Sequence, residues 1–212
     1  MFNFCVMKRL IRLLALSFII SVSATAQSLV SAEIHKNSSL TITGSTNLVS
    51  FKIYQNGDKL SRSKLSVITT QIQNKIFVSQ NQLSVVVKNF ASNNALALKD
   101  FLKLLKSGNF PTLQVQLNYL DLQPIYEKGK TYNGEASVNI TITGKTKQYS
   151  IPITFNSNGD VYTVNGNKKL SIRDFGLTPE NKMMGMIKVS EWIDIDFHII
   201  CKTSTNGDLV KL

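Results

Sequence analysis

Four titratable side chains lie close together near the C-terminus: Glu191, Asp194, Asp196 and His198. Carboxylates beside a histidine could act as general acid and general base, provided that a cavity shifts their pKa values apart. Asp194, Asp196 and His198 alternate with apolar residues over 193–199. Because successive side chains of a strand point to opposite faces, this alternation predicts that the three polar side chains point to solvent. An outward face supplies no such cavity, so we expect no enzyme activity here.

The sequence offers little for a metal ion or a nucleophile. His35 and His198 are the only histidines, and Cys201 is the only cysteine besides Cys5. These residues lack metal-ligand spacing, and the chain contains no GxSxG, HExxH or P-loop motif. One thiol cannot close an internal disulfide, and nothing beside Cys201 in the sequence predicts a depressed pKa, so we expect a buried, inert thiol. We therefore predict no metal and no cofactor.

The start of the chain has the pattern of an export signal. Three basic residues precede an apolar run over 13–22, and small residues at 24–26 supply a cleavage site. The run is shorter than the roughly 20 apolar residues that a membrane span needs. The sequence therefore predicts a signal peptide over 1–26. The remainder, 27–212, has no linker rich in Pro, Gly or Ser and is expected to be one exported domain, periplasmic or secreted.

The chain is strongly basic, with a formal net charge of +11. Three of its 24 Lys and Arg residues lie in the predicted leader and none of its 13 acids does, which leaves +8 for the exported part. The basic residues are scattered singly, without an arginine-rich run or interleaved aromatics, so we expect no nucleic-acid partner. A solvated basic surface is the favoured interpretation, and a weak attraction to anionic membrane surfaces is the alternative. Whether two copies form a homodimer is left open.

Beyond the leader, the dominant hydrophobic period is two, as in strands with one buried face. Within 48–54, Val49, Phe51 and Ile53 share one face and polar residues share the other. The same alternation predicts strands over 83–87, 113–119, 136–142, 149–155 and 193–199, and weaker ones over 65–70, 75–78, 161–164 and 169–173. Strands buried on both faces would be apolar throughout, so these are expected to be antiparallel strands with one solvent-facing side.

Short sequences containing Asn and Gly separate these strands, because both residues tolerate positive φ. We expect turns at 56–58, 133–134, 158–160, 165–167 and 206–208. The repeated TITG sequence, at 41–44 and 141–144, predicts two strands that each end in a glycine turn. Pro152 has no N–H to donate, which predicts an edge or a local break in pairing.

One segment, residues 94–108, has a helical period instead. Leu98, Phe101, Leu102 and Leu105 fall at i, i+3, i+4 and i+7, with charged residues between them. Asn94 can cap the start of this helix, and a glycine at its far end can stop it. The apolar stripe of an inserted amphipathic helix needs a surface to cover, and an open end or face of the sheet would provide one.

Eight or so strands with one apolar face each can form a sandwich or a closed barrel. Large inward residues on nearly all the strong strands favour the barrel, because about eight strands enclose a space that side chains can fill or that one slender ligand can occupy. We predict an all-β, antiparallel eight-stranded barrel with one inserted amphipathic helix.

Several sequence segments, in this order and spacing, resemble the YceI-like family of exported, polyisoprenoid-binding proteins. They are TITGSTN at 41–47, VVVKNF at 85–90, NFPTLQVQL at 109–117, VNITITGKTK at 138–147 and LSIRDFGLTPENKMMGMIKVSEWIDIDFHI at 170–199. The resemblance runs from about residue 40 to residue 200. It implies a lipocalin-like eight-stranded barrel whose apolar bore takes a long isoprenoid chain in some relatives.

These observations predict an exported lipid-binding protein that holds a long apolar chain of isoprenoid type in its bore. Met184 and Met186 are included among the lining residues because flexible thioethers can adapt to such a chain. The expected bore residues are Val49, Phe51, Ile53, Val85, Val87, Val115, Leu117, Ile140, Ile142, Ile151, Ile153, Phe175, Met184, Met186, Ile195 and Phe197. The alternative is a cavity-free envelope interaction or structural module that acts through its outer surface.

Overall fold

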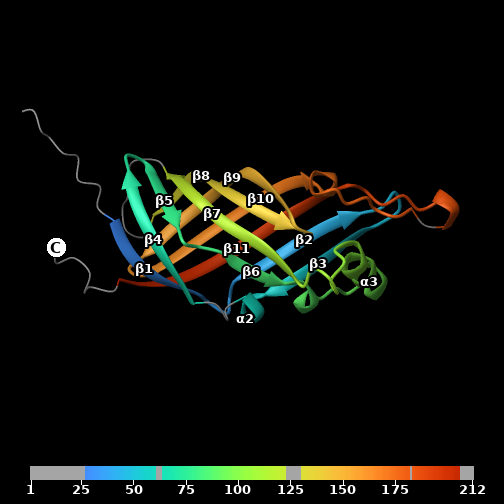
Figure 1. The fold of residues 1–212 in the computed structure, drawn as a ribbon, viewed down its shortest axis with the longest axis horizontal. Coiled ribbons are helices and arrows are strands. Elements are labelled where there is room, and N and C mark those ends of the chain that lie inside the picture. Colours follow the sequence, from blue (N-terminus) through green and yellow to red (C-terminus); the bar gives the residue numbers. More distant parts are fainter. Residues whose placement is uncertain (1–26, 61–63, 123–129, 182, 206–212) are drawn as a thin grey trace, which may run out of the picture.

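Eight antiparallel strands close into a ring in the computed structural model, which describes residues 27–60, 64–122, 130–181 and 183–205. In ring order the strands are β1 (Gln27–Ile34), β4 (Lys64–Ile72), β5 (Lys75–Ser79), β7 (Thr112–Leu122), β8 (Thr131–Ile142), β9 (Lys145–Asn158), β10 (Val161–Ser171) and β11 (Trp192–Thr205). Pairing of β1 with β11 closes the ring (Figure 1). The predicted all-β antiparallel fold is confirmed.

Three further strands extend the ring at one end. The long strand β11 pairs with β1 through residues 201–205 and with β2 (Ser39–Ser45) through 194–198, and β2 in turn pairs with β3 (Ser50–Asn56). In the same way, β7 pairs first with β6 (Leu83–Val86) and then with β5. Within the described part of the chain, β3 and β6 share no ladder, and the sheet is open between them.

Helix α3 (Ala95–Leu104) lies beside this opening (Figure 1). Asn94 caps it by accepting a hydrogen bond from the Ala97 backbone N–H at 3.0 Å, as predicted. Leu105 is buried just past the helix, and Phe101 packs edge-on against Phe90 with ring centroids 5.2 Å apart. The predicted apolar stripe therefore packs on the core. The helix ends before the predicted residue 108. Two short helical turns also follow strands of the extension: α2 (Gly57–Leu60) comes directly after β3, and η1 (Val87–Asn89) comes directly after β6.

Pro152 marks a second opening, between β9 and β10. The ladder between these strands begins at the turn over 158–161, and its last pair is Ile153 with Gly166. It therefore stops at the residue next to Pro152. The predicted local break is thus confirmed. The short helix η2 (Ile172–Phe175) lies against β9 beyond the break, where its Phe175 ring is 6.2 Å from that of Tyr149 and is almost fully buried.

Two of the predicted turns are wrong, because glycine serves close packing there instead of chain reversal. Residues 165–167 lie inside β10, where the ring of Phe197 lies across Gly166. Residues 133–134 lie inside β8, where a Cβ at Gly134 would come within 2.5 Å of the Asp121 carbonyl oxygen. The sequence predicts two short strands here, over 161–164 and 169–173, but the structure has one continuous strand, β10.

Other turn predictions have mixed outcomes. The turn at 158–160 joins β9 to β10, with Gly159 at φ +66°, and residues 56–58 lead into α2. Of the two TITG repeats, Gly144 does form a turn at φ +79°, whereas Gly44 lies inside β2. The predicted turn at 206–208 lies outside the described residues.

A β-bulge in β7 changes which residues face inward. The register with β8 shifts between Leu117 and Tyr119, so the regular alternation predicted over 113–119 is wrong at its last residue, and Tyr119 lies on the opposite face from Leu117. Tyr119 instead packs against Phe77, with ring centroids 5.6 Å apart, and Leu122 takes an inward, almost fully buried position. The bulge keeps the inner face of β7 apolar along its whole length.

Candidate ligand-binding interior

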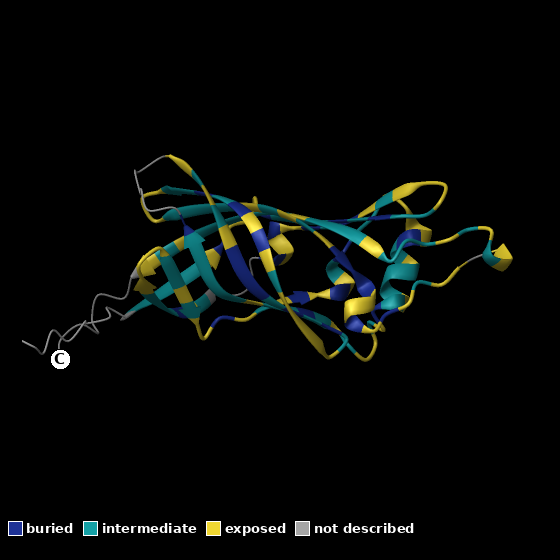
Figure 2. Cartoon of the chain, turned by 90° about the horizontal axis from the view of Figure 1, so that it is seen from above, coloured by how far each residue is buried: buried dark blue, intermediate teal, exposed yellow. Residues whose placement is uncertain are grey.

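The inward faces of the strands form one apolar core, visible as buried stripes along the strands (Figure 2). Each ring strand contributes at least one buried or half-buried apolar side chain. Members from the ring and its extension include Ile34, Ile42, Ile53, Ile76, Leu113, Leu122, Val138, Ile140, Ile151, Ile153, Phe155, Leu170 and Ile195. On β4, Val67 is buried as well. Such a face, closed around its axis, excludes water and suits an apolar chain.

Most of the residues that the sequence predicts to line the bore lie in this core. Eight are buried: Ile53, Val85, Val87, Ile140, Ile142, Ile151, Ile153 and Phe175. Four are half-buried and pack on the buried cluster: Phe51, Leu117, Ile195 and Phe197. Val115 is half-buried and pairs in register with Ile140, which places it on the same inward face.

Three of the expected bore residues are not in the interior. Val49, Met184 and Met186 are exposed in two loops at one end of the molecule. Val49 continues the alternation of Phe51 and Ile53, but β3 begins only at Ser50, so the pattern runs past the end of the strand. The two methionines follow η2 in a loop that includes the single turn η3 (Met183–Gly185). Their assignment to the bore is therefore corrected.

Gln55 is an interior residue that the sequence reasoning missed. It lies on the inward face of β3, follows Phe51 and Ile53 at period two, and is only 1% exposed. Neither its side-chain nitrogen nor its oxygen has a hydrogen-bond partner. A buried amide left unpaired costs about 1–3 kcal/mol. The signal that could have found it is a polar residue on the apolar face of an alternating strand.

Asn81 shows how a buried amide is normally satisfied in this fold. It lies where β5 gives way to β6, and its Nδ2 donates to the carbonyl oxygens of Val78 (2.9 Å) and Leu117 (2.7 Å). Its Oδ1 accepts from the Leu117 N–H at 2.7 Å. Asn81 therefore replaces the ladder bonds that β7 loses between its two partner strands, whereas Gln55 has no such structural partner.

Two titratable side chains on inward faces are held neutral. Burial raises the pKa of the Cys201 thiol to about 11. Burial, followed by a 2.9 Å hydrogen bond to Asp174, raises the pKa of the Tyr149 phenol. The thiol is thus protonated at neutral pH, which agrees with the expectation of an inert cysteine.

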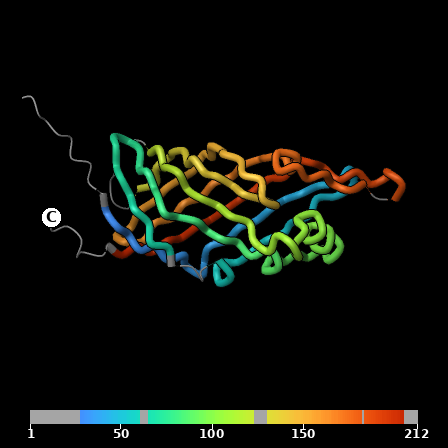
Figure 3. Tube along the Cα trace, in the orientation of Figure 1, coloured from blue at the N-terminus to red at the C-terminus, as the bar shows by residue number. Residues whose placement is uncertain are grey.

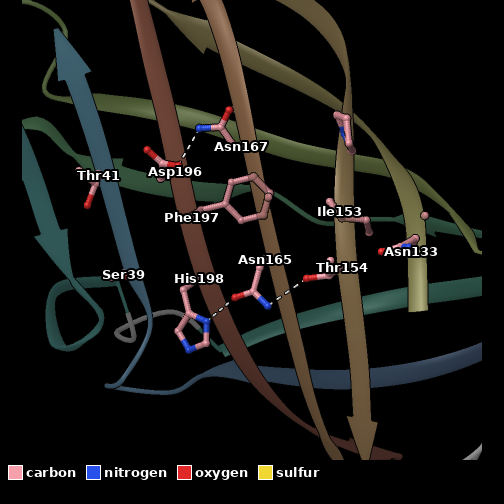
Figure 4. Close-up of a pocket in the computed structure, with 13 residues that line it drawn as sticks. Ser39, Thr41, Asn133, Ile153, Thr154, Asn165, Asn167, Asp196, Phe197 and His198 are labelled. Atoms are coloured by element: carbon pink, nitrogen blue, oxygen red, sulfur yellow. Dashed lines mark hydrogen bonds between the residues drawn. The ribbon is translucent and has the colours of Figure 1, made fainter. Parts of the chain in front are cut away.

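The acids near the C-terminus point outward, as predicted. Asp196 accepts a hydrogen bond from Asn167 at 2.6 Å, and His198 Nδ1 contacts the Asn165 side-chain oxygen (Figure 4). These groups line an open hollow of about 570 Å³ across the outer face of β8–β11 and β2. Glu191 is paired with Arg173. The described residues contain no group of three or more His, Cys, Asp or Glu that could hold a metal ion.

None of the helices in the described residues is long and apolar enough to cross a membrane.

Comparisons with known proteins found several solved structures that are similar to this chain. A polyisoprenoid-binding domain from Saccharophagus degradans, implicated in plant cell wall breakdown, superposes with a TM-score of 0.56 at 10% identity, covering 85% of this chain and 100% of that one. BcnA from Burkholderia cenocepacia gives a TM-score of 0.42 at 16% identity over 82% and 95% of the two chains. The YceI protein of Campylobacter jejuni gives 0.45 at 10% identity over 89% of each. No curated protein matched the sequence.

Because the Saccharophagus degradans domain is only 10% identical to this chain, its similarity supports the fold and nothing further. The family assignment rests on the sequence model of the YceI-like domain, which matches residues 21–201 and thus most of the chain. The closed antiparallel ring and its apolar interior agree with that match. This protein is a member of the YceI-like domain family.

Proposed function

We propose that this protein is an exported carrier that holds one long apolar molecule of isoprenoid type inside its ring of strands. The observation that carries the proposal is the apolar inward face, to which every ring strand contributes. Each methylene withdrawn from water into such an interior contributes about 0.8 kcal/mol, so a chain-like ligand needs few polar contacts. Family membership supports a lipid-binding role over a catalytic one.

The shape of the interior favours a long ligand over a compact one. β9 and β11 each have 14 residues. A strand of that length spans about 45 Å. The long strands β8–β11 run obliquely along the long axis of the molecule (Figure 1), so their apolar faces form an elongated interior. A flexible isoprenoid chain can lie along it.

The unpaired side-chain amide of Gln55 favours a ligand that carries one polar group. This amide can both donate and accept, so a hydroxyl, carbonyl or phosphate oxygen on the ligand would remove the cost of burying it. The Saccharophagus degradans domain is described as polyisoprenoid-binding, which supports the same ligand class. An apolar chain with a single oxygen-bearing end satisfies both observations.

Export is part of the proposal. The predicted signal peptide over 1–26 lies outside the described residues, so its support is the sequence pattern. Mass measurement of the protein recovered from the exported fraction should give a chain that begins at Gln27. Recovery of the intact chain from the cytoplasm would contradict export.

Uptake of a fluorescent isoprenoid tests the carrier function. Val115→Trp and Ile142→Trp each add bulk on the inward face and should reduce uptake at least about tenfold while leaving the far-UV circular dichroism unchanged. Gln116→Trp is the matched control, because Gln116 is exposed on the outer face of the same strand as Val115. Unchanged uptake in both inward variants would contradict an interior ligand and would favour a module that acts through its outer surface.

A further inference from the structure

We propose that two joined loops at one end of the molecule form a docking site for an anionic lipid bilayer. The loops are residues 46–49, between β2 and β3, and residues 183–189, before β11; together they are called the tip. They project side by side beyond the strands at the end of the molecule opposite β1 (Figures 1 and 3). Neither loop belongs to the proposed ligand-binding interior.

Hydrogen bonds hold the two loops of the tip together. The Asn47 backbone N–H donates to the Lys188 carbonyl oxygen at 3.0 Å, and the Lys188 N–H donates to Asn47 Oδ1 at 2.9 Å. Asn47 Nδ2 also donates to the Met186 carbonyl oxygen at 3.0 Å. An isolated bridge pairs Thr46 with Val189. The tip is therefore a single structural unit.

The tip concentrates exposed apolar side chains. Leu48 is 68% exposed, Met186 is 66% exposed and Met184 is fully exposed. With Val49 and Met183, these are five of the ten large hydrophobic residues that are exposed in the described chain. Single exposed hydrophobic residues are normal on a protein surface, but a cluster of them marks an interaction site. Flexible methionine side chains suit a partner without a fixed shape.

The charges around the tip favour an anionic partner. Residues 44–54 and 183–190 contain two lysines, Lys52 and Lys188, and no acid. Glu191, the acid that directly follows, is paired with Arg173. Glu180, the nearest acid before this loop, is paired with Lys103 at 2.8 Å. Lysines beside an apolar cluster are the combination with which proteins bind anionic membrane surfaces.

A bilayer explains this surface better than a second copy of the chain does. A symmetric dimer through the tip would bring the same positive patches together, whereas anionic headgroups would neutralise Lys52 and Lys188 and allow Met184 and Leu48 to enter the apolar layer. The purpose of such docking rests on the proposed carrier function, since an apolar ligand must leave or enter a membrane. The opening of the sheet beside α3 lies toward the same end of the molecule (Figure 1).

Co-sedimentation with vesicles tests the proposal. The full-length exported protein should bind vesicles of equal parts phosphatidylglycerol and phosphatidylcholine, and bind pure phosphatidylcholine more weakly. The double variant Leu48→Asp/Met184→Asp should lower the partition coefficient at least about tenfold. Lys188→Gln should lower it about fivefold, and this difference should shrink as salt is added. Ile72→Asp, an exposed apolar residue on β4, is the matched control and should bind normally.

Uptake of the fluorescent isoprenoid, measured without vesicles, separates this proposal from the proposed function. The Leu48→Asp/Met184→Asp variant should lose vesicle binding and keep uptake. Equal vesicle binding by this variant and the wild type would overturn the docking site. So would a concentration-dependent dimer that the same variant abolishes, because the tip would then be an interface between copies. If the wild-type protein binds vesicles but takes up no fluorescent isoprenoid, the docking site is supported and only the carrier function is contradicted.

Discussion

The ring of Phe197 on β11 lies across Gly166 on the paired strand β10, in the space that a Cβ at residue 166 would occupy. The same relationship recurs between Phe51 on β3 and Gly44 on β2, where a Cβ would lie 2.6 Å from the ring. In both pairs the glycine lets an aromatic ring fold flat onto the neighbouring strand. Both aromatic residues belong to the expected bore lining, so these glycines allow two of the expected bore residues to lie close against the sheet.

Gly166→Ala should therefore destabilise the protein. The new methyl group would displace the Phe197 ring, and overpacking of this kind costs about 1–3 kcal/mol in free energy of unfolding, measurable by urea denaturation. Gly108→Ala is the matched control, because nothing lies within 4 Å of the position that its Cβ would take. In a Phe197→Ala background the cost of Gly166→Ala should disappear. An equal cost in both backgrounds would show that the ring contact is not the cause.

Gln55→Leu should have opposite effects on stability and on ligand selectivity. Removing the unpaired amide should raise the free energy of unfolding of the ligand-free protein by about 1–2 kcal/mol. The same variant should lose affinity for geranylgeraniol but not for the hydrocarbon with the same carbon skeleton. Gln116→Leu, an exposed substitution, controls for the change in side-chain polarity. Equal affinities of the Gln55→Leu protein and the wild type for the alcohol would contradict a polar contact at Gln55.

The thiol of Cys201 should make the free energy of unfolding depend on pH in the alkaline range. Burial raises its pKa from 9.0 to about 11 in the folded protein, so the folded state keeps a proton that the unfolded state loses between these values. The contribution of this thiol to stability is full below about pH 9 and should decline as the pH rises toward about 11. Cys201→Ala should remove that part of the pH dependence. In the folded wild type, the thiol should also react slowly with a thiol reagent at pH 8, and rapid reaction would contradict its burial.

The alternation of residues within single strands could be predicted from the sequence. Ile53, Ile151 and Ile195 lie on inward faces as the period of two requires, and Asn94 caps α3 as its position before the helical stripe suggests. These features depend on neighbouring residues, whose geometry is local. The family match rests on the same local signals repeated over most of the chain.

Features that depend on distant partners could not be predicted. The sequence around Gly166 predicts a turn, and only the pairing of Gly166 with Phe197 shows why it belongs in a strand. The bulge after Leu117 depends on the register between β7 and β8. Similarly, Val49 and Met184 are apolar and satisfy a simple pattern, but the ends of the strands place them at the exposed tip.

The central claim is that the interior binds a long apolar molecule, and native mass spectrometry tests it most directly. The protein should be purified from its exported compartment without detergent, weighed intact, and then extracted with organic solvent. We predict one bound apolar molecule per chain, of isoprenoid type, that is released on extraction. A bare polypeptide that also fails to take up added isoprenoids would contradict the carrier function.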